Sequence, residues 1–228
     1  MSRAAGDTAI AQYCRRLITG CPPPLSIGLY GTGILLSRAK SGGQDDDSGQ
    51  MRLFAMSEQL VLLAEEGELQ RLFGELPPLL PHRLAALEAL NRMLLNAPGV
   101  GDLSWALAGP AAGATRWHAR YAQLDTAARA LPLLQDAGLP VREFMASRLD
   151  DFLTNGGGRY GDIFLALATS WFRIRMLCAL WSEARGVLTE AHARQLMAQL
   201  AEWEGCCPPR AGENVTADYR LLCGLSLL

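Results

Sequence analysis

Two glycines near the N-terminus have the spacing with which a phosphate-binding loop begins. In LSIGLYGTGILLS, residues 25–37, Gly31 and Gly33 match the first two positions of the GxGxxG pattern, which brings a dinucleotide pyrophosphate to a helix start. The third position holds Leu36, whose side chain would keep helix and strand apart. No alternation of strands and helices follows, so the sequence argues against nucleotide binding here.

Metal-ligating and nucleophilic side chains are present, but their spacing matches no recognised set. The acidic residues 45–47 lack the alternating oxygen spacing of a calcium loop. The histidines are His82, His118 and His192. None follows a glutamate by three positions, which excludes the di-iron bundle pattern and leaves a single axial histidine for haem as an open alternative. We therefore predict no metal or cofactor and favour a non-catalytic role, leaving enzymatic activity open.

Arginines interleaved with aromatic residues form the first candidate binding set. The segment RWHARY places Arg116 and Arg120 on one helical edge, with Trp117 and Tyr121 beside them. Such a mixture suits stacking on bases, contacts to phosphate or a protein hot spot. The simpler interpretation is a helix whose aromatic residues face the core while its arginines face water. Two further tryptophans are candidate anchors for a partner, namely Trp105 and Trp203.

A second candidate set lies in the most apolar segment of the chain, which Arg173 and Arg175 interrupt. These arginines must reach the surface, pair with carboxylates or meet the anionic group of a ligand. Carboxylates that could pair with them are, for example, Asp150, Asp151 or Glu183. Because the arginines limit the apolar run to about half of a bilayer-spanning length, we expect a buried central helix and no membrane span.

The elements that position these residues are predicted to be mainly α-helical. From about residue 57 onward, apolar residues recur at helical intervals between proline and glycine stops, which indicates about seven or eight helices. Pro132 is expected to kink or divide one long helix, and Thr189 to cap another. We therefore expect a multi-helix, bundle-like single domain over residues 1–228.

Residues 25–56 are expected to differ from the rest of the chain. Their glycines weaken a helix, and two short apolar runs flank a segment rich in glycine, serine and aspartate. This pattern favours a short β-hairpin-like arm near residues 25–56, with a flexible loop at residues 38–50.

The amino-acid composition and net charge indicate the general class of protein. Half of the 228 residues are apolar and 19% are charged, which indicates an ordered globular chain with apolar surface to spare for a partner. The net charge of −2 gives no general attraction to nucleic acid or to anionic membranes, so nucleic acid is expected only within a complex. The N-terminal segment has arginines where a secretory signal would be apolar, and we expect a cytoplasmic or otherwise intracellular protein.

These observations predict a non-catalytic helical adaptor or structural subunit of a larger assembly. It would bind one or more protein partners, or itself, through helix faces and the N-terminal arm. The alternative is a helical enzyme or ligand-binding protein that encloses an apolar anionic small molecule. In that case Arg173 or Arg175 would hold the anionic group.

Overall fold

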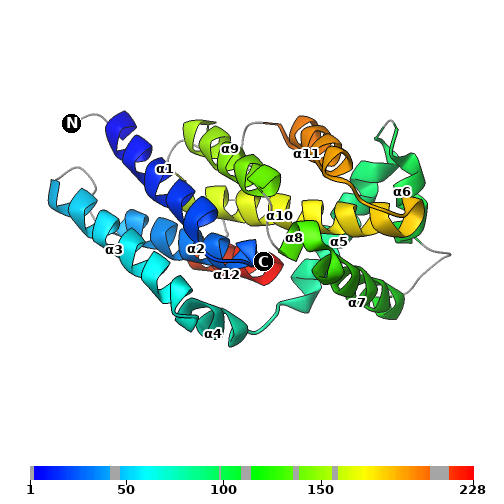
Figure 1. Ribbon diagram of the computed structural model, residues 1–228, viewed down its shortest axis with the longest axis horizontal. Helices are drawn as coiled ribbons and strands as arrows, with labels where there is room; N and C mark the ends of the chain where they lie inside the picture. Colours follow the sequence, from blue (N-terminus) through cyan, green and yellow to red (C-terminus); the bar gives the residue numbers. More distant parts are fainter. Residues whose placement is uncertain are drawn as a thin grey trace.

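The described part of the chain contains α-helices and no strands. The computed structural model describes residues 3–41, 47–97, 99–108, 114–135, 139–155, 159–205 and 216–228. Its helices (Figure 1) are α1 (Arg3–Gly20), α2 (Leu25–Ser41), α3 (Asp47–Glu65), α4 (Glu68–Gly74), α5 (Leu80–Leu95), α6 (Gly101–Ala108), α7 (Ala114–Ala130), α8 (Pro132–Gln135), α9 (Leu139–Asn155), α10 (Tyr160–Arg185), α11 (Glu190–Glu204) and α12 (Ala217–Leu227). The mainly α class is therefore confirmed, with twelve helices in these residues where about seven or eight were predicted.

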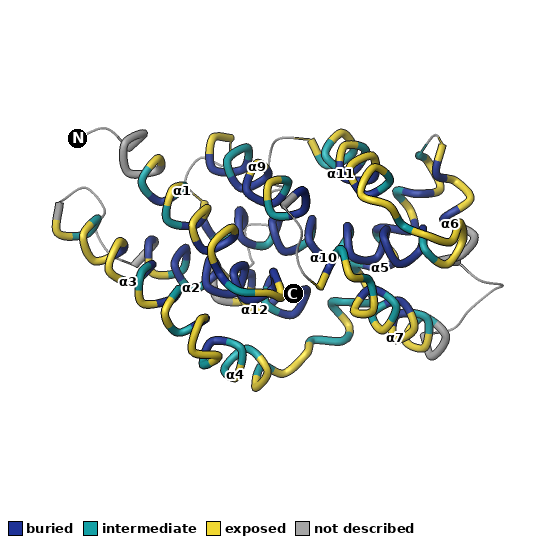
Figure 2. The backbone as a smooth tube through the Cα atoms, viewed as in Figure 1, coloured by how far each residue is buried: buried dark blue, intermediate teal, exposed yellow. Residues whose placement is uncertain are grey.

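Helix α10 is the axis around which the other helices are arranged. It packs against α2, α5, α6, α7, α9, α11 and α12 (Figure 1). Figure 2 shows it buried along nearly its whole length, whereas α3 and α4 present exposed residues on the outside. A helix that is apolar on all sides must be covered on all sides. Helix α10 is also long and apolar enough to cross a membrane. Of the stretch of α10 that meets this criterion, 83% is buried inside the protein.

The predicted β-hairpin-like arm near residues 25–56 is wrong for the residues that the structure describes. Helix α2 occupies residues 25–41, and α3 begins at Asp47, before the apolar run that was expected to form a strand. Of the loop predicted at residues 38–50, both ends are helical, and residues 42–46 lie outside the described residues.

The glycines that favoured a strand instead allow close contact between helices. A Cβ atom at Gly28 would lie 2.4 Å from the backbone oxygen of Leu17 on α1. A Cβ at Gly33 would lie 2.6 Å from the ring of Phe164 on α10, and one at Gly224 on α12 would lie 2.7 Å from the same ring. The packing gained at these contacts outweighs the roughly 1 kcal/mol that a glycine costs inside a helix.

Two local predictions at helix ends are confirmed. Pro132 separates α7 from the short helix α8, because a proline cannot donate the backbone hydrogen bond that would continue the helix. Thr189 caps α11, where its hydroxyl oxygen accepts a hydrogen bond from the backbone N–H of His192 at 3.3 Å. These ends set the directions in which α8 and α11 pass the central helix.

Candidate functional site

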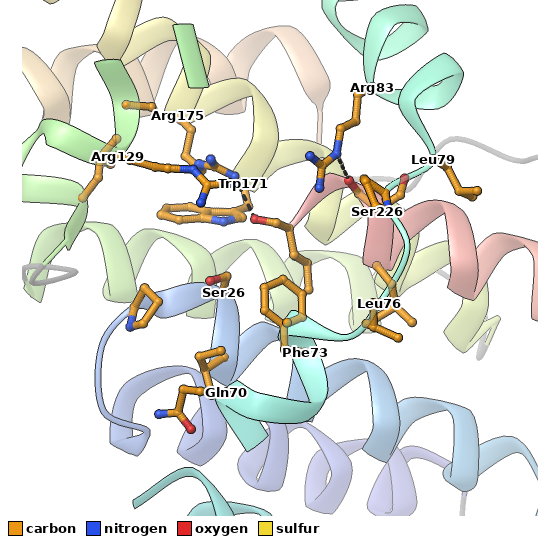
Figure 3. A pocket seen from close by; sticks show the side chains of 18 of the residues that line it. Ser26, Gln70, Phe73, Leu76, Leu79, Arg83, Arg129, Trp171, Arg175 and Ser226 are labelled. Atoms are coloured by element: carbon orange, nitrogen blue, oxygen red, sulfur yellow. Dashed lines mark hydrogen bonds between the residues drawn. The ribbon is translucent and has the colours of Figure 1, made fainter. Parts of the chain in front are cut away.

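A cavity of about 930 Å³ opens among α2, α4, α5, α7, α8, α10 and α12. Its walls are mostly apolar, and Figure 3 shows the polar side chains that interrupt them. The apolar lining residues include Ile27, Phe73, Leu76, Leu79, Leu134, Trp171, Leu222 and Leu225. Small-molecule sites are typically apolar cavities of about 300–1,000 Å³ with a few placed polar groups. The size and lining of this cavity therefore match a ligand site.

Prolines shape one side of this cavity. Pro23 and Pro24 lie between α1 and α2, while Pro77 and Pro78 lie between α4 and α5. Because proline interrupts the helical hydrogen-bond pattern, the chain crosses these positions as connections and not as continuous helices. The two connections line the cavity. One separates the end of α1 from the start of α2, and the other separates the end of α4 from the start of α5.

Three arginines from three helices line the cavity: Arg83 on α5, Arg129 on α7 and Arg175 on α10. Asp125 on α7 pairs with Arg129 at 2.9 Å and also with Arg175. Among the described residues no other carboxylate side chain forms an ion pair with these arginines. The side chains therefore place three positive charges against one negative charge at this cavity.

Arg175 is fixed by partners on several sides. Its Nη1 donates a hydrogen bond to the backbone oxygen of Leu228 at 2.7 Å, and its Nη2 donates to Asp125. The guanidinium carbon also lies 5.9 Å from the ring centroid of Trp171. Burial lowers the pKa of Arg175, the carboxylate of Asp125 opposes that change, and the positive charges of Arg129 and Arg83 add to it. Both Arg83 and Arg129 are thus close enough to Arg175 to act on its charge.

Arg83 links the cavity to a buried tyrosine. Its Nε donates to the backbone oxygen of Ser226, and its Nη1 donates to the hydroxyl of Tyr121 at 3.0 Å (Figure 3 shows the bond to Ser226). Tyr121 is buried and stacks on Phe172 with ring centroids 6.1 Å apart. Burial raises the pKa of Tyr121, so its hydroxyl keeps its proton at neutral pH.

Two buried polar atoms on lining residues have no hydrogen-bond partner among the described residues. They are the indole Nε1 of Trp171 and the side-chain oxygen Oε1 of Gln70. Most buried polar groups in folded proteins do have a partner. Both atoms are shielded from solvent, so they lie behind the cavity surface and are not contacts that the cavity offers to a ligand.

A second cavity of about 810 Å³ lies among α5, α9, α10 and α11, and both Arg173 and Trp203 line it. Arg173 donates to buried Glu204 at 2.8 Å, and Arg148 donates to the same carboxylate at 3.2 Å. Ser170 donates to it as well, at 2.5 Å. Because Glu204 already takes these donors, Arg173 belongs to an internal network that ties α9 and α11 to the central helix.

The sequence-predicted residues are not brought together in one place. Arg120 forms two hydrogen bonds, of 2.8 and 2.9 Å, with Glu183 at the surface. Trp117 is half-buried and packs on the core, and Trp203 is half-buried beside the second cavity. The side chains of Trp105 and Arg116 lie outside the described residues.

The carboxylates named as possible partners of Arg173 and Arg175 pair with other arginines. Asp150 pairs with Arg15, Asp151 with Arg148 and Glu183 with Arg120. The observed partners, Glu204 and Asp125, are distant in sequence from the arginines that they bind. The contacts of Asp125 with Arg129 and of Asp151 with Arg148, four and three residues apart on one helix, have spacings that sequence alone could have found.

In the part of the chain that the structure describes, no group of three or more histidine, cysteine, aspartate or glutamate side chains is placed to hold a metal ion. Comparison of the chain with protein-family models, with curated proteins and with solved structures found no match. A function for this protein therefore has to be proposed from its own geometry.

Proposed function

We propose that the protein binds an apolar small molecule that carries an anionic group, in the cavity lined by Arg83, Arg129 and Arg175. The observation that carries this proposal is the excess of guanidinium groups over carboxylates in a mostly apolar cavity. Like charges gathered at one cavity repel one another, and an anion relieves that repulsion. Arginine donors also form strong, charge-assisted hydrogen bonds with anionic oxygens.

Part of this cluster has a structural explanation. Arg83 donates to the backbone oxygen of Ser226 in the last turn of α12, where helical carbonyls lack partners within the helix, and Arg175 donates to an oxygen of Leu228, the last residue of the sequence. Arg129 has no such role. Its side chain is 70% exposed and its described partner is Asp125, one turn earlier on α7. The guanidinium of Arg129 is solvent-exposed and Asp125 keeps Arg175 as a partner, so losing Arg129 should cost little stability. Arg129 is therefore the residue whose substitution tests ligand binding without disturbing the contacts at the end of α12.

The test is native mass spectrometry of the full-length protein purified gently from its own cells, together with an Arg129→Ala variant. The matched control is Arg194→Ala, because Arg194 is also exposed and pairs with Glu190 one turn away on α11. We expect a reproducible small-molecule mass on the wild type and the control, and a reduced occupancy on Arg129→Ala. Wild-type protein that carries no small molecule would overturn the proposal.

A second candidate function is the adaptor or structural subunit, in a cytoplasmic or otherwise intracellular assembly. The observation that favours it is an exposed apolar face on α3, where Met51, Phe54 and Leu62 are 70%, 46% and 56% exposed. Their spacing places them on one side of the helix. A protein partner or a second copy would be expected there, and the same mass spectra would report its mass. A Phe54→Glu substitution should remove that species, and an unchanged stoichiometry would exclude this face.

A further inference from the structure

We infer that the ligand is a straight-chain aliphatic carboxylate, whose head group is bound by Arg83 and Arg129 and whose chain lies along the aliphatic wall of the cavity. This inference rests on the proposed function and specifies the chemical class of the ligand. It also assigns different roles to the three arginines.

The lining favours an aliphatic body over an aromatic one. The cavity has two aromatic lining residues among those described, and the rings of both already have partners. Phe73 packs on Tyr30 with ring centroids 5.4 Å apart, and Trp171 lies beneath the guanidinium of Arg175. A planar aromatic ligand would compete with these contacts, because ring faces are what it stacks on. The other apolar lining residues are leucine, isoleucine, alanine and proline, against which a flexible hydrocarbon chain can pack.

The cavity is also polarised. Figure 3 shows Arg83, Arg129 and Arg175 on one side, while Phe73 and Leu76 lie on the opposite side. A ligand with charge at one end and hydrocarbon at the other satisfies both sides at once. A ligand with a charged group at each end, or a polyol, would place polar groups against the apolar side of the cavity, which is unfavourable.

The hydrogen bonds of the arginines assign the head group. Both Nη atoms of Arg175 are occupied, by Leu228 and Asp125, so Arg175 acts as a positioning residue that holds the cationic wall in place. Nη2 of Arg83 and both Nη atoms of Arg129 have no partner among the described residues. A carboxylate offers two oxygens and can accept from such donors in pairs. A phosphate monoester shares this chemistry, and the test separates the two.

The test is isothermal titration calorimetry of the full-length protein, below the concentration at which the ligands form micelles. The probes are dodecanoate, dodecyl phosphate, dodecanol and naphthoate. We expect dodecanoate to bind with a stoichiometry of one and more tightly than the other three. Arg129→Ala should weaken dodecanoate about tenfold or more, because a charge-assisted hydrogen bond is lost. Arg194→Ala should stay within about twofold of the wild type, since Arg194 is likewise an exposed arginine paired one turn away but does not line the cavity.

The alternative outcomes overturn different statements. Tighter binding of naphthoate or of dodecyl phosphate than of dodecanoate would overturn the ligand class and leave the proposed function standing. Equal binding of dodecanol and dodecanoate would overturn anion recognition, and the proposed function with it. Failure of all four probes would overturn the ligand class, and the mass spectra of the purified protein would then decide the proposed function independently.

A second variant tests where the chain lies without touching the arginines. Leu76 lies in the connection between α4 and α5 and lines the cavity on the side away from the arginines (Figure 3), so Leu76→Trp should reduce the space for the chain with little effect on the helices. We expect at least about fivefold weaker dodecanoate binding and an unchanged affinity for octanoate, whose chain is shorter. Equal losses for both ligands, or none for either, would overturn the assigned position of the chain.

Discussion

Arg175 and Trp171 lie one turn apart on α10, and the guanidinium carbon of Arg175 is 5.9 Å from the ring centroid of Trp171. Both residues line the large cavity. The central helix of the protein therefore contributes a cation and an aromatic surface at the same place. A buried arginine is tolerated in such a helix only if its charge is paired, and Asp125 provides the pairing carboxylate.

The first prediction concerns the stability that this pairing provides. Arg175→Met should destabilise the protein by about 3 kcal/mol, because it leaves a carboxylate with 15% exposure and a backbone oxygen without their donor. Urea unfolding followed by circular dichroism measures the change in the free energy of unfolding. Arg129→Ala, which removes an exposed partner of the same carboxylate, should change it by less than about 1 kcal/mol. Equal effects of the two substitutions would contradict the account of Arg175 as the fixed member of the cluster.

The second prediction concerns the contact between Gly33 and Phe164. Gly33→Ala should destabilise the protein by about 1–3 kcal/mol, because the new Cβ would lie 2.6 Å from the Phe164 ring. The matched control is Gly31→Ala on the same helix, where the nearest atom would be an ordinary 3.4 Å away. There the better helix propensity of alanine should leave stability unchanged or raise it by up to about 1 kcal/mol.

Chemical denaturation of both glycine variants makes this comparison. Adding Phe164→Leu to Gly33→Ala should recover part of the lost stability, because a smaller side chain makes room for the methyl group. If Gly33→Ala proves as stable as Gly31→Ala, then the close approach of the Phe164 ring is not the reason for glycine at position 33.

The third prediction is a loss of stability at alkaline pH. Burial raises the pKa of the Cys21 thiol from 9.0 to about 11 and that of Cys178 from 9.0 to about 12. A raised pKa means that the folded state favours the protonated thiol, so its contribution is complete below pH 9 and is lost as the pH rises toward the folded-state value. Each of these thiols should cost on the order of 1 to 2 kcal/mol between pH 9 and pH 10.5.

Urea midpoints measured from pH 7 to pH 10.5 test this dependence. Cys178→Ala removes one of the titrating groups, so its stability should fall less steeply with pH than that of the wild type, whatever its stability at pH 7. Parallel pH profiles for the two proteins would show that this thiol is not responsible.

The fourth prediction concerns the carboxylate of the second cavity. Glu204→Ala should destabilise the protein by about 3–5 kcal/mol, because Glu204 is 6% exposed and its removal leaves Arg148 without its buried partner. Glu190→Ala on the same helix removes an exposed pair and should cost less than about 1 kcal/mol. Thermal unfolding compares the two variants, and a small effect of Glu204→Ala would mean that the network does not hold α9 and α11 in place.

The parts of the fold that depend on local chemistry could be predicted from the sequence. Helical periodicity indicated the mainly α class, and the boundaries at Pro132 and Thr189 follow from properties of those residues alone. The β-like arm was a wrong prediction because glycine lowers helix propensity locally. The close contact of Gly33 with Phe164, which lies 131 positions later in the chain, reverses that preference.

The candidate site was even less visible in the sequence. Arg175 was singled out because it interrupts an apolar run, and the structure places it at the cavity. Arg83 carried no such signal, since its partner Ser226 is 143 residues away. Side chains that meet only through tertiary packing leave no spacing pattern for sequence reasoning to detect. Trp203 and Arg120 were selected by residue type alone, and neither of them lines this cavity.

The most direct test of the central claim is a crystal structure of the full-length protein with ω-bromododecanoate, in which anomalous scattering locates the bromine at the end of the chain. We predict a bromine peak on the aliphatic side of the large cavity, near Leu76, with the carboxylate within hydrogen-bond distance of Arg129. A bromine peak in the second cavity or on the outer face of α3, with the large cavity lacking ligand density, would contradict the claim that this cavity is the binding site.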